Sequence, residues 1–153
     1  MGREIRRVPI DWEHPWDELG RYKPLYDDSF DNAARLWLEE FRKFMEENPD
    51  GRTPLNENGH QSYFWEWYGT PPDEEYYRPD WPAEAMTAYQ IYETVSEGTP
   101  VSPVLATKAA MHLWLLGQGH SQKSAAAFID SGWAPSMIFA DGQIRVGIDS
   151  LDV

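Results

Sequence analysis

The chain has 153 residues, no cysteine and a formal net charge of −13 at pH 7. The absence of cysteine excludes disulfides, thiolate nucleophiles and Cys-ligated zinc. The excess of carboxylates argues against direct binding to nucleic acid, because carboxylates and phosphates repel each other. No apolar run approaches the roughly 18 residues of a membrane span, and the N-terminus lacks the apolar segment of a secretory signal. We expect one domain, residues 1–153, with no membrane partner.

Proline and glycine interrupt the first 27 residues, so short extended pieces are expected there, with a strand over residues 6–10. The clearest element is a helix over residues 29–47, in which apolar residues recur at the spacing of an amphipathic helix. Either Asp28 or Ser29 can cap its start. Three large rings of its apolar face are expected in the core: Trp37, Phe41 and Phe44.

Residues 48–82 are loop-rich and contain six prolines. Within them, the aromatic run 63–68 fits a short strand with alternating faces. Side chains that alternate between two faces also predict a strand over residues 88–95. A further edge strand is expected over residues 101–104, beside two prolines.

The C-terminal third predicts two short helices and a hairpin. Thr107 can cap a helix over residues 108–116, and a second helix covers residues 121–131. Strands over 136–140 and 143–148 flank Asp141-Gly142, which is a strong hairpin signal. The expected fold is therefore α+β, with one long amphipathic helix and two short helices on a small, mostly antiparallel sheet.

The negative charge is concentrated in the middle of the chain. Residues 24–97 hold seventeen of the twenty-six carboxylates and only five basic residues, together with most of the aromatic rings. Tyr and Trp often dominate interface energy, and surrounding carboxylates speed the encounter with a basic partner. The simpler alternatives are that the rings pack on the core and that the charge serves solubility. The candidate partner-binding residues are Glu66, Trp67, Asp73, Glu74, Glu75, Tyr76, Tyr77, Asp80, Trp81 and Glu84.

The sequence gives little support for catalysis. The four histidines lack metal-ligand spacing, no serine lies in a nucleophile elbow, and no phosphate-binding loop is present. The sequence does not exclude sites for Mg²⁺ or Ca²⁺ that are formed by carboxylates alone. We therefore expect no enzyme activity, no catalytic residue and no cofactor. One enzymatic alternative is a small carboxylate-dependent hydrolase, because Glu66 beside Trp65 and Trp67 resembles the lining of a sugar-cleaving cleft.

Four sequence blocks resemble a family of small uncharacterised accessory proteins of tailed phages. The first is Gly2-Arg3-Glu4-Ile5-Arg6-Arg7-Val8-Pro9 with Trp12-Glu13-His14-Pro15. The others are Tyr76-Tyr77-Arg78-Pro79-Asp80-Trp81, the segment 92–104 (YETVSEGTPVSPV) and Ser131-Gly132-Trp133-Ala134-Pro135-Ser136-Met137, so the blocks thread the whole chain. Some members of that family carry a Cys cluster suited to zinc between the first two blocks. This chain has no cysteine, so that site does not carry over.

The resemblance implies a phage accessory protein in the host bacterial cytoplasm and transfers no reaction. Small acidic phage proteins are often antagonists of host defence. The leading hypothesis is therefore an anti-CRISPR-like inhibitor that binds a basic host protein, a CRISPR effector or another defence nuclease, and occludes its nucleic-acid-binding surface. A phage structural or assembly factor is the first alternative, and the small hydrolase is the second.

Overall fold

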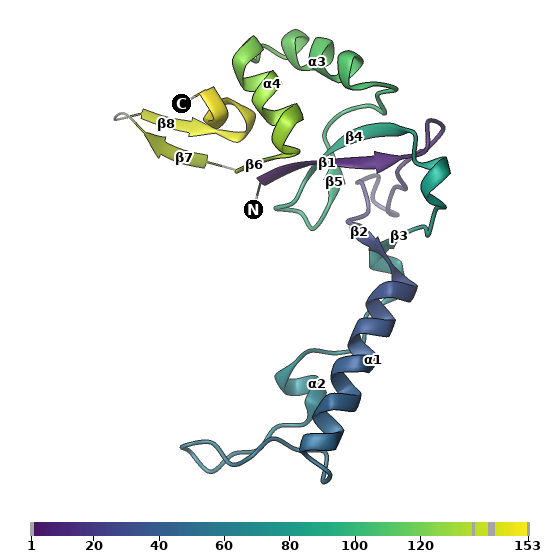
Figure 1. Ribbon diagram of the computed structural model, residues 1–153, viewed down its shortest axis with the longest axis vertical. Coiled ribbons are helices and arrows are strands. Elements are labelled where there is room, and N and C mark those ends of the chain that lie inside the picture. The colour runs from purple at the N-terminus through teal and green to yellow at the C-terminus, as the bar shows by residue number, and fades with distance from the viewer. Residues whose placement is uncertain (1, 136, 141–142, 153) are drawn as a thin grey trace. The chain divides into compact units, whose positions relative to one another are not determined.

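The computed structural model describes residues 2–135, 137–140 and 143–152 (Figure 1). The fold is α+β, as the sequence predicts. Backbone contacts divide the chain into two compact units, each described by itself below. We call Met1–Asp27 with Trp81–Val153 the sheet unit, and Asp28–Asp80 the aromatic unit. The expectation of one domain stays a prediction.

The sheet unit is built on a four-stranded antiparallel sheet. Its spatial order is β5-β4-β1-β6, and the central pair is in register with Ile5 opposite Ile91. The strand predicted over residues 6–10 instead runs over Gly2–Val8. It ends before Pro9, because proline has no N–H with which to continue the ladder. The strands are β1 (Gly2–Val8), β4 (Ala88–Glu93), β5 (Thr99–Pro100) and β6 (Trp133–Pro135).

Two helices, α3 (Lys108–Gly117) and α4 (Gln122–Ser131), cover one face of this sheet (Figure 1). Both predicted helices are confirmed. The Thr107 and Ser121 side chains accept hydrogen bonds from the first turns, which satisfies backbone donors that have no partner within the helix. Fully buried side chains from strand and helix form the core: Ile91, Met111, Leu115, Ala125 and Phe128.

The C-terminal strands β7 (Met137–Ala140) and β8 (Gln143–Val146) pair antiparallel, as predicted for a hairpin. The second strand ends earlier than expected, because a 3₁₀ segment, η3 (Gly147–Asp152), begins at Gly147. Ile148 of that segment enters the core. The Asp141-Gly142 turn lies outside the described residues.

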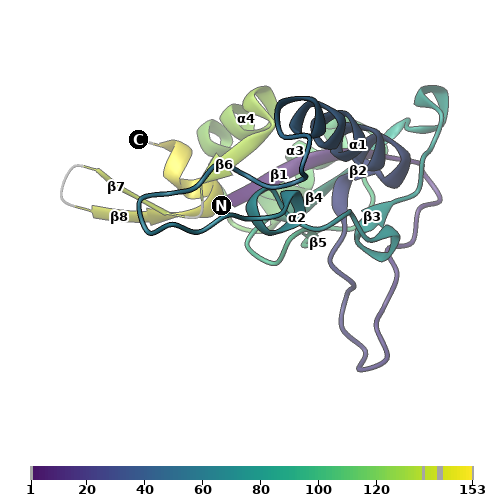
Figure 2. The ribbon, with the colours of Figure 1, turned by 90° about the horizontal axis from the view of Figure 1, so that it is seen from below.

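The opposite face of the sheet is polar where β1 and β4 meet. Arg6 and Gln90 pair across the strands, and Tyr92 lies on the same face of β4; all three side chains are buried. The loop of residues 9–25 lies on this side of the sheet, away from α3 and α4 (Figure 2). The loop therefore covers polar groups, and it does so through hydrogen bonds described below.

The aromatic unit contains the long helix α1 (Phe30–Glu47), which confirms the predicted helix, with Ser29 as its N-cap. Its small core centres on Phe64, whose side chain is 1% exposed. The Phe64 ring lies within 5.4 Å of Trp37, Phe41 and Phe44, centroid to centroid. The other elements of this unit are α2 (Phe64–Trp67), the 3₁₀ turn η1 (Glu74–Tyr76) and β3 (Tyr77–Arg78), which pairs with β2 (Tyr26–Ser29). A second 3₁₀ turn, η2 (Ala83–Ala85), belongs to the sheet unit.

The predicted strand 63–68 is wrong, because this segment contains the helical turn α2. The Glu66 carboxylate accepts a hydrogen bond from the backbone N–H of Tyr63 at 2.9 Å, which favours a helix start. Helical spacing then brings Phe64 and Tyr68 to the same side, where their rings stack at 4.9 Å. Burial of Phe64 against α1 therefore outweighs the alternating pattern.

The predicted edge strand 101–104 is also wrong, since β5 covers only Thr99–Pro100. The backbone N–H of Ile91 donates to the Ser102 hydroxyl at 2.9 Å, so a side chain replaces a ladder carbonyl. Pro103 has no N–H to donate. The segment therefore runs beside β4 without continuing the sheet.

Candidate functional site

The ten residues predicted to bind a partner are divided between the two units. Those from Glu66 to Asp80 belong to the aromatic unit, whereas Trp81 and Glu84 belong to the sheet unit. Within the aromatic unit, two of them lie in α2 and the other six lie in residues 73–80, which contain the η1 turn and β3. We call the eight of them in the aromatic unit the acidic strap: Glu66, Trp67, Asp73, Glu74, Glu75, Tyr76, Tyr77 and Asp80.

At the α2 turn, large rings are exposed to solvent. The Trp67 side chain is 63% exposed, although one side of it stacks on Phe44 at 5.8 Å. Tyr63 and Trp65 are also exposed and stack on each other at 4.8 Å, nearly parallel. Stacking between side chains fixes the rings before any partner arrives, which lowers the ordering cost of binding.

At the η1 turn, carboxylates surround a second exposed ring. The Asp73 carboxylate accepts a hydrogen bond from the backbone N–H of Glu75 at 3.0 Å and thereby caps the turn. Asp73, Glu74, Glu75 and Tyr76 are all exposed. Tyr77 instead is partly buried, with its ring 6.3 Å from Phe30.

Trp81 is partly buried and meets the Trp12 ring edge-on at 4.7 Å within the sheet unit. Its ring therefore contributes to packing there. Glu84, in η2, is exposed.

The aromatic unit carries thirteen of the chain's twenty-six carboxylates but only five of its thirteen basic residues. Two of those bases form exposed ion pairs on α1, Arg35 with Glu39 at 2.7 Å and Lys43 with Glu40 at 3.3 Å. Such pairs contribute little stability, and a large negative excess remains.

The N-terminal arginines are engaged inside the sheet unit. Arg3 pairs with Glu93 at 3.2 Å, and Arg6 pairs with Glu4 at 2.8 Å. Arg7 donates to the carbonyl of Met86 at 2.8 Å.

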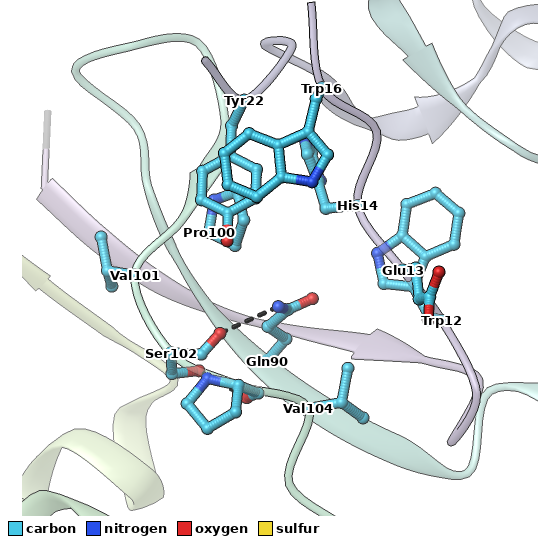
Figure 3. Close-up of a pocket in the computed structure, with 11 residues that line it drawn as sticks. Trp12, Glu13, His14, Trp16, Tyr22, Gln90, Pro100, Val101, Ser102 and Val104 are labelled. Atoms are coloured by element: carbon cyan, nitrogen blue, oxygen red, sulfur yellow. Dashed lines mark hydrogen bonds between the residues drawn. The ribbon is translucent and has the colours of Figure 1, made fainter. Parts of the chain in front are cut away.

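The sheet unit also holds a groove of about 690 Å³ that the sequence did not suggest (Figure 3). One wall is formed by rings of the 9–25 loop, including Trp12, Trp16 and Tyr22, and the other by residues 100–104. Gln90 of β4 lies between them, and its amide donates to the carbonyl of Ser102 at 2.9 Å. We call this site the aromatic groove.

A buried hydrogen-bond network supports the loop wall. The Tyr92 hydroxyl accepts from the indole N–H of Trp12 at 3.0 Å and lies 2.9 Å from Nδ1 of His14. Nε2 of His14 contacts the carbonyl of Lys23, so the histidine joins both ends of the loop to the sheet. Because a carbonyl only accepts, Nε2 carries a proton, and the unprotonated Nδ1 is an acceptor. The single hydroxyl hydrogen of Tyr92 faces two acceptors, Nδ1 of His14 at 2.9 Å and Oε1 of Gln90 at 3.2 Å.

Burial changes the titration of this network. Desolvation lowers the pKa of His14, the Lys23 carbonyl opposes that shift, and the positive charge of Arg6 adds to it. Desolvation also raises the pKa of Tyr92. Both groups are therefore held in their neutral forms near pH 7.

A second cavity of the sheet unit, about 520 Å³, brings a serine and a histidine into one lining. It contains His120, whose Nδ1 lies 2.6 Å from a carboxylate oxygen of Asp149, and also Ser96. The Ser96 hydroxyl is bonded to Thr99 and to the carbonyl of Glu93. In the described part of the chain no hydrogen bond joins Ser96 to His120, so the arrangement is not an assembled nucleophile and base.

Among residues 2–135, 137–140 and 143–152, no three histidines, aspartates or glutamates gather in a way that could hold a metal ion. Within the same described residues, no helix is both long enough and apolar enough to cross a bilayer. Comparison with known proteins found no matching family model, no matching curated protein and no matching solved structure.

Proposed function

We propose that this chain is a non-enzymatic inhibitor that binds a basic protein through the acidic strap of its aromatic unit. The observation that carries the proposal is the combination, at the η1 turn, of exposed Asp73, Glu74 and Glu75 with the exposed ring of Tyr76. Trp67 and Glu66 add a second exposed ring and carboxylate at α2. Rings supply contact area, and carboxylates supply attraction to lysine and arginine.

The basic partner most consistent with this chemistry is a protein that normally binds nucleic acid. Such a surface carries clustered lysine and arginine that neutralise phosphates. Carboxylates held on a compact scaffold present a comparable negative field, and the aromatic unit has a large negative excess. Together with the sequence resemblance to phage accessory proteins, this leads us to a CRISPR effector or another defence nuclease in the host bacterial cytoplasm as the target.

The test is capture of host proteins by the tagged chain at low and at high salt, followed by competition with heparin. We expect a basic nucleic-acid-binding protein that is retained at low salt and released by heparin or by high salt, because ions screen surface charge attraction. The purified partner must then lose nuclease activity when the chain is added. Retention that is insensitive to both salt and heparin would remove charge mimicry from the mechanism.

Charge-reversal variants locate the surface. The strap variant carries Asp73→Lys, Glu74→Lys, Glu75→Lys and Asp80→Lys. The matched control makes the same change in net charge at four exposed carboxylates of the sheet unit: Asp11→Lys, Glu18→Lys, Glu97→Lys and Asp130→Lys. We expect the strap variant to lose inhibition while its melting temperature falls by no more than the loss of the Asp73 cap explains, and we expect the control to retain most of its inhibition. Equal losses in the two variants would show that only net charge matters.

A further inference from the structure

We propose that the aromatic groove of the sheet unit binds an extended, proline-rich peptide segment that carries a basic residue beside its prolines. The site shares no residue with the acidic strap. The proposal therefore stands or falls independently of the proposed function.

The groove has the size and construction of a preformed site. Its volume of about 690 Å³ lies inside the range of roughly 300–1,000 Å³ that is usual for ligand pockets. The loop wall is tied to the sheet through His14 and Tyr92, as described above. The facing wall is fixed as well, because the N–H of Val101 donates to Ile91 and the N–H of Leu105 donates to Tyr89.

The loop wall offers a flat ring to an incoming ligand. Trp16 stacks on Tyr22 at 3.9 Å between centroids, and Figure 3 shows the indole lying over the tyrosine ring. Trp16 is nevertheless 58% exposed. The stacking orients the indole, and its other side remains available for contact. Proline rings pack well against such aromatic surfaces, and polyproline segments dock in aromatic-lined grooves.

The hydrogen-bonding groups of the groove fit a ligand that presents acceptors. Among the described residues, the indole N–H of Trp16 has no hydrogen-bond partner. Gln90 is only 6% exposed and uses one of its two amide hydrogens, in the bond to Ser102. A polyproline helix exposes backbone carbonyls and has no N–H groups of its own. Donors in the groove thus meet acceptors on the peptide.

The charge of the groove selects among ligands. Among the residues that the structure describes, neither lysine nor arginine lines the groove, whereas the exposed carboxylate of Glu13 does. An anionic ligand would therefore be repelled. A neutral saccharide would bring no cation and would leave the Glu13 carboxylate without an ionic partner. A basic residue beside the prolines can pair with Glu13, and this accounts for the proposed composition.

The experiment uses a blocked peptide of eight prolines with one terminal arginine as the probe. It is titrated into the full-length chain while the indole N–H signals are followed by NMR and the heat of binding by calorimetry. We expect saturable binding, with the signal of Trp16 among those that shift. Absence of saturation up to about 1 mM peptide would overturn the proposal, because the dissociation constant would then lie well above about 1 mM, which is too weak for a specific site.

Two variants from opposite walls test the location, Trp16→Ala and Val104→Lys. Each is expected to raise the dissociation constant at least about tenfold, which corresponds to roughly 1.4 kcal/mol. The matched control is Trp133→Ala, because Trp133 is an exposed tryptophan of the same unit, 45% exposed, that does not line the groove. Equal weakening by the control, or full binding by both wall variants, would contradict the assignment.

Two further arms test the ligand class. Glu13→Gln should remove the preference for the arginine-bearing peptide over the same peptide ending in glutamine. A neutral oligosaccharide, maltohexaose, replaces the peptide in a parallel titration. Binding of maltohexaose at Trp16 without binding of the peptide would overturn the peptide assignment in favour of a sugar.

Discussion

The guanidinium carbon of Arg6 lies 4.2 Å from the centroid of the Tyr92 ring, and both side chains are buried on the polar face of the sheet. Arg6 also donates to the carbonyl of Leu25 at 2.6 Å and pairs with Glu4. One buried cation thus links β1, β4 and the end of the loop that walls the aromatic groove. A cation over a ring in a desolvated place contributes about 2 kcal/mol or more to stability. This contact is therefore one of the main interactions that hold the loop against the sheet.

Arg6→Ala should destabilise the chain by about 3 kcal/mol, because it leaves the carbonyl of Leu25 and the carboxylate of Glu4 without their donor. Urea unfolding monitored by tryptophan fluorescence measures the change. Arg7→Ala is the matched control, since the Arg7 side chain is exposed, and a loss below about 1 kcal/mol is expected there. Similar losses for the two variants would show that burial of Arg6 is not what stabilises the loop.

Phe64→Ala should disrupt the core of the aromatic unit. The Phe64 ring contacts three rings of α1, so its removal leaves a cavity that costs about 3–5 kcal/mol. Near-ultraviolet circular dichroism and urea unfolding measure the loss. Trp65→Ala, in the same helical turn but 46% exposed, should change stability by less than about 1 kcal/mol. A tolerant Phe64 position would mean that this cluster does not hold the unit together.

The sequence predicted helices better than strands for reasons visible in particular residues. Ser29, Thr107 and Ser121 are local caps, and each lies where the helix starts. The strand predicted over residues 63–68 was wrong because burial of Phe64 against a helix distant in the sequence outweighed the alternating pattern of side chains. The strand predicted over residues 101–104 was wrong because the Ser102 hydroxyl, rather than a backbone carbonyl, accepts the hydrogen bond from the N–H of Ile91.

The candidate sites differ in the same way. The acidic strap is visible as composition, so its residues could be named from the sequence, although their burial could not. Trp16 and Gln90 are 74 positions apart in the sequence, and no local pattern joins them. The aromatic groove is formed by the 9–25 loop, Gln90 of β4 and residues 100–104, which are far apart in the sequence. Composition thus indicates a surface, whereas a groove requires long-range contacts.

Ser102→Ala should cost about 1–3 kcal/mol, because it leaves the buried backbone N–H of Ile91 without an acceptor. Hydrogen exchange adds a local readout, and we expect the amide of Ile91 to exchange faster than in the parent chain. Ser131→Ala is the control, since the Ser131 side chain is exposed and caps no core amide. Unchanged protection of Ile91 would mean that another group accepts this bond.

The stability of the sheet unit should fall as the pH is lowered below about 6.5, and His14 should account for part of the fall. Burial lowers the pKa of His14 in the folded chain, whereas in the unfolded chain His14 has its ordinary pKa of about 6.5. Between those two values the unfolded state binds a proton that the folded state does not, so the free energy of unfolding decreases as the pH falls. Above that window His14 is neutral in both states and contributes no pH dependence.

Urea unfolding at pH 7.5 and pH 5.5 measures the effect of His14, and His14→Gln is the variant. Glutamine keeps a hydrogen-bonding group but does not titrate, so the difference in stability between the two pH values should be smaller in the variant than in the parent chain. His60→Gln, at an exposed histidine of the aromatic unit, is the control for the loss of an imidazole side chain as such. If His14→Gln retained the full pH dependence of the free energy of unfolding, other groups would take up the proton on unfolding. The burial of His14 between Tyr92 and Lys23 would then not contribute to the pH dependence of stability.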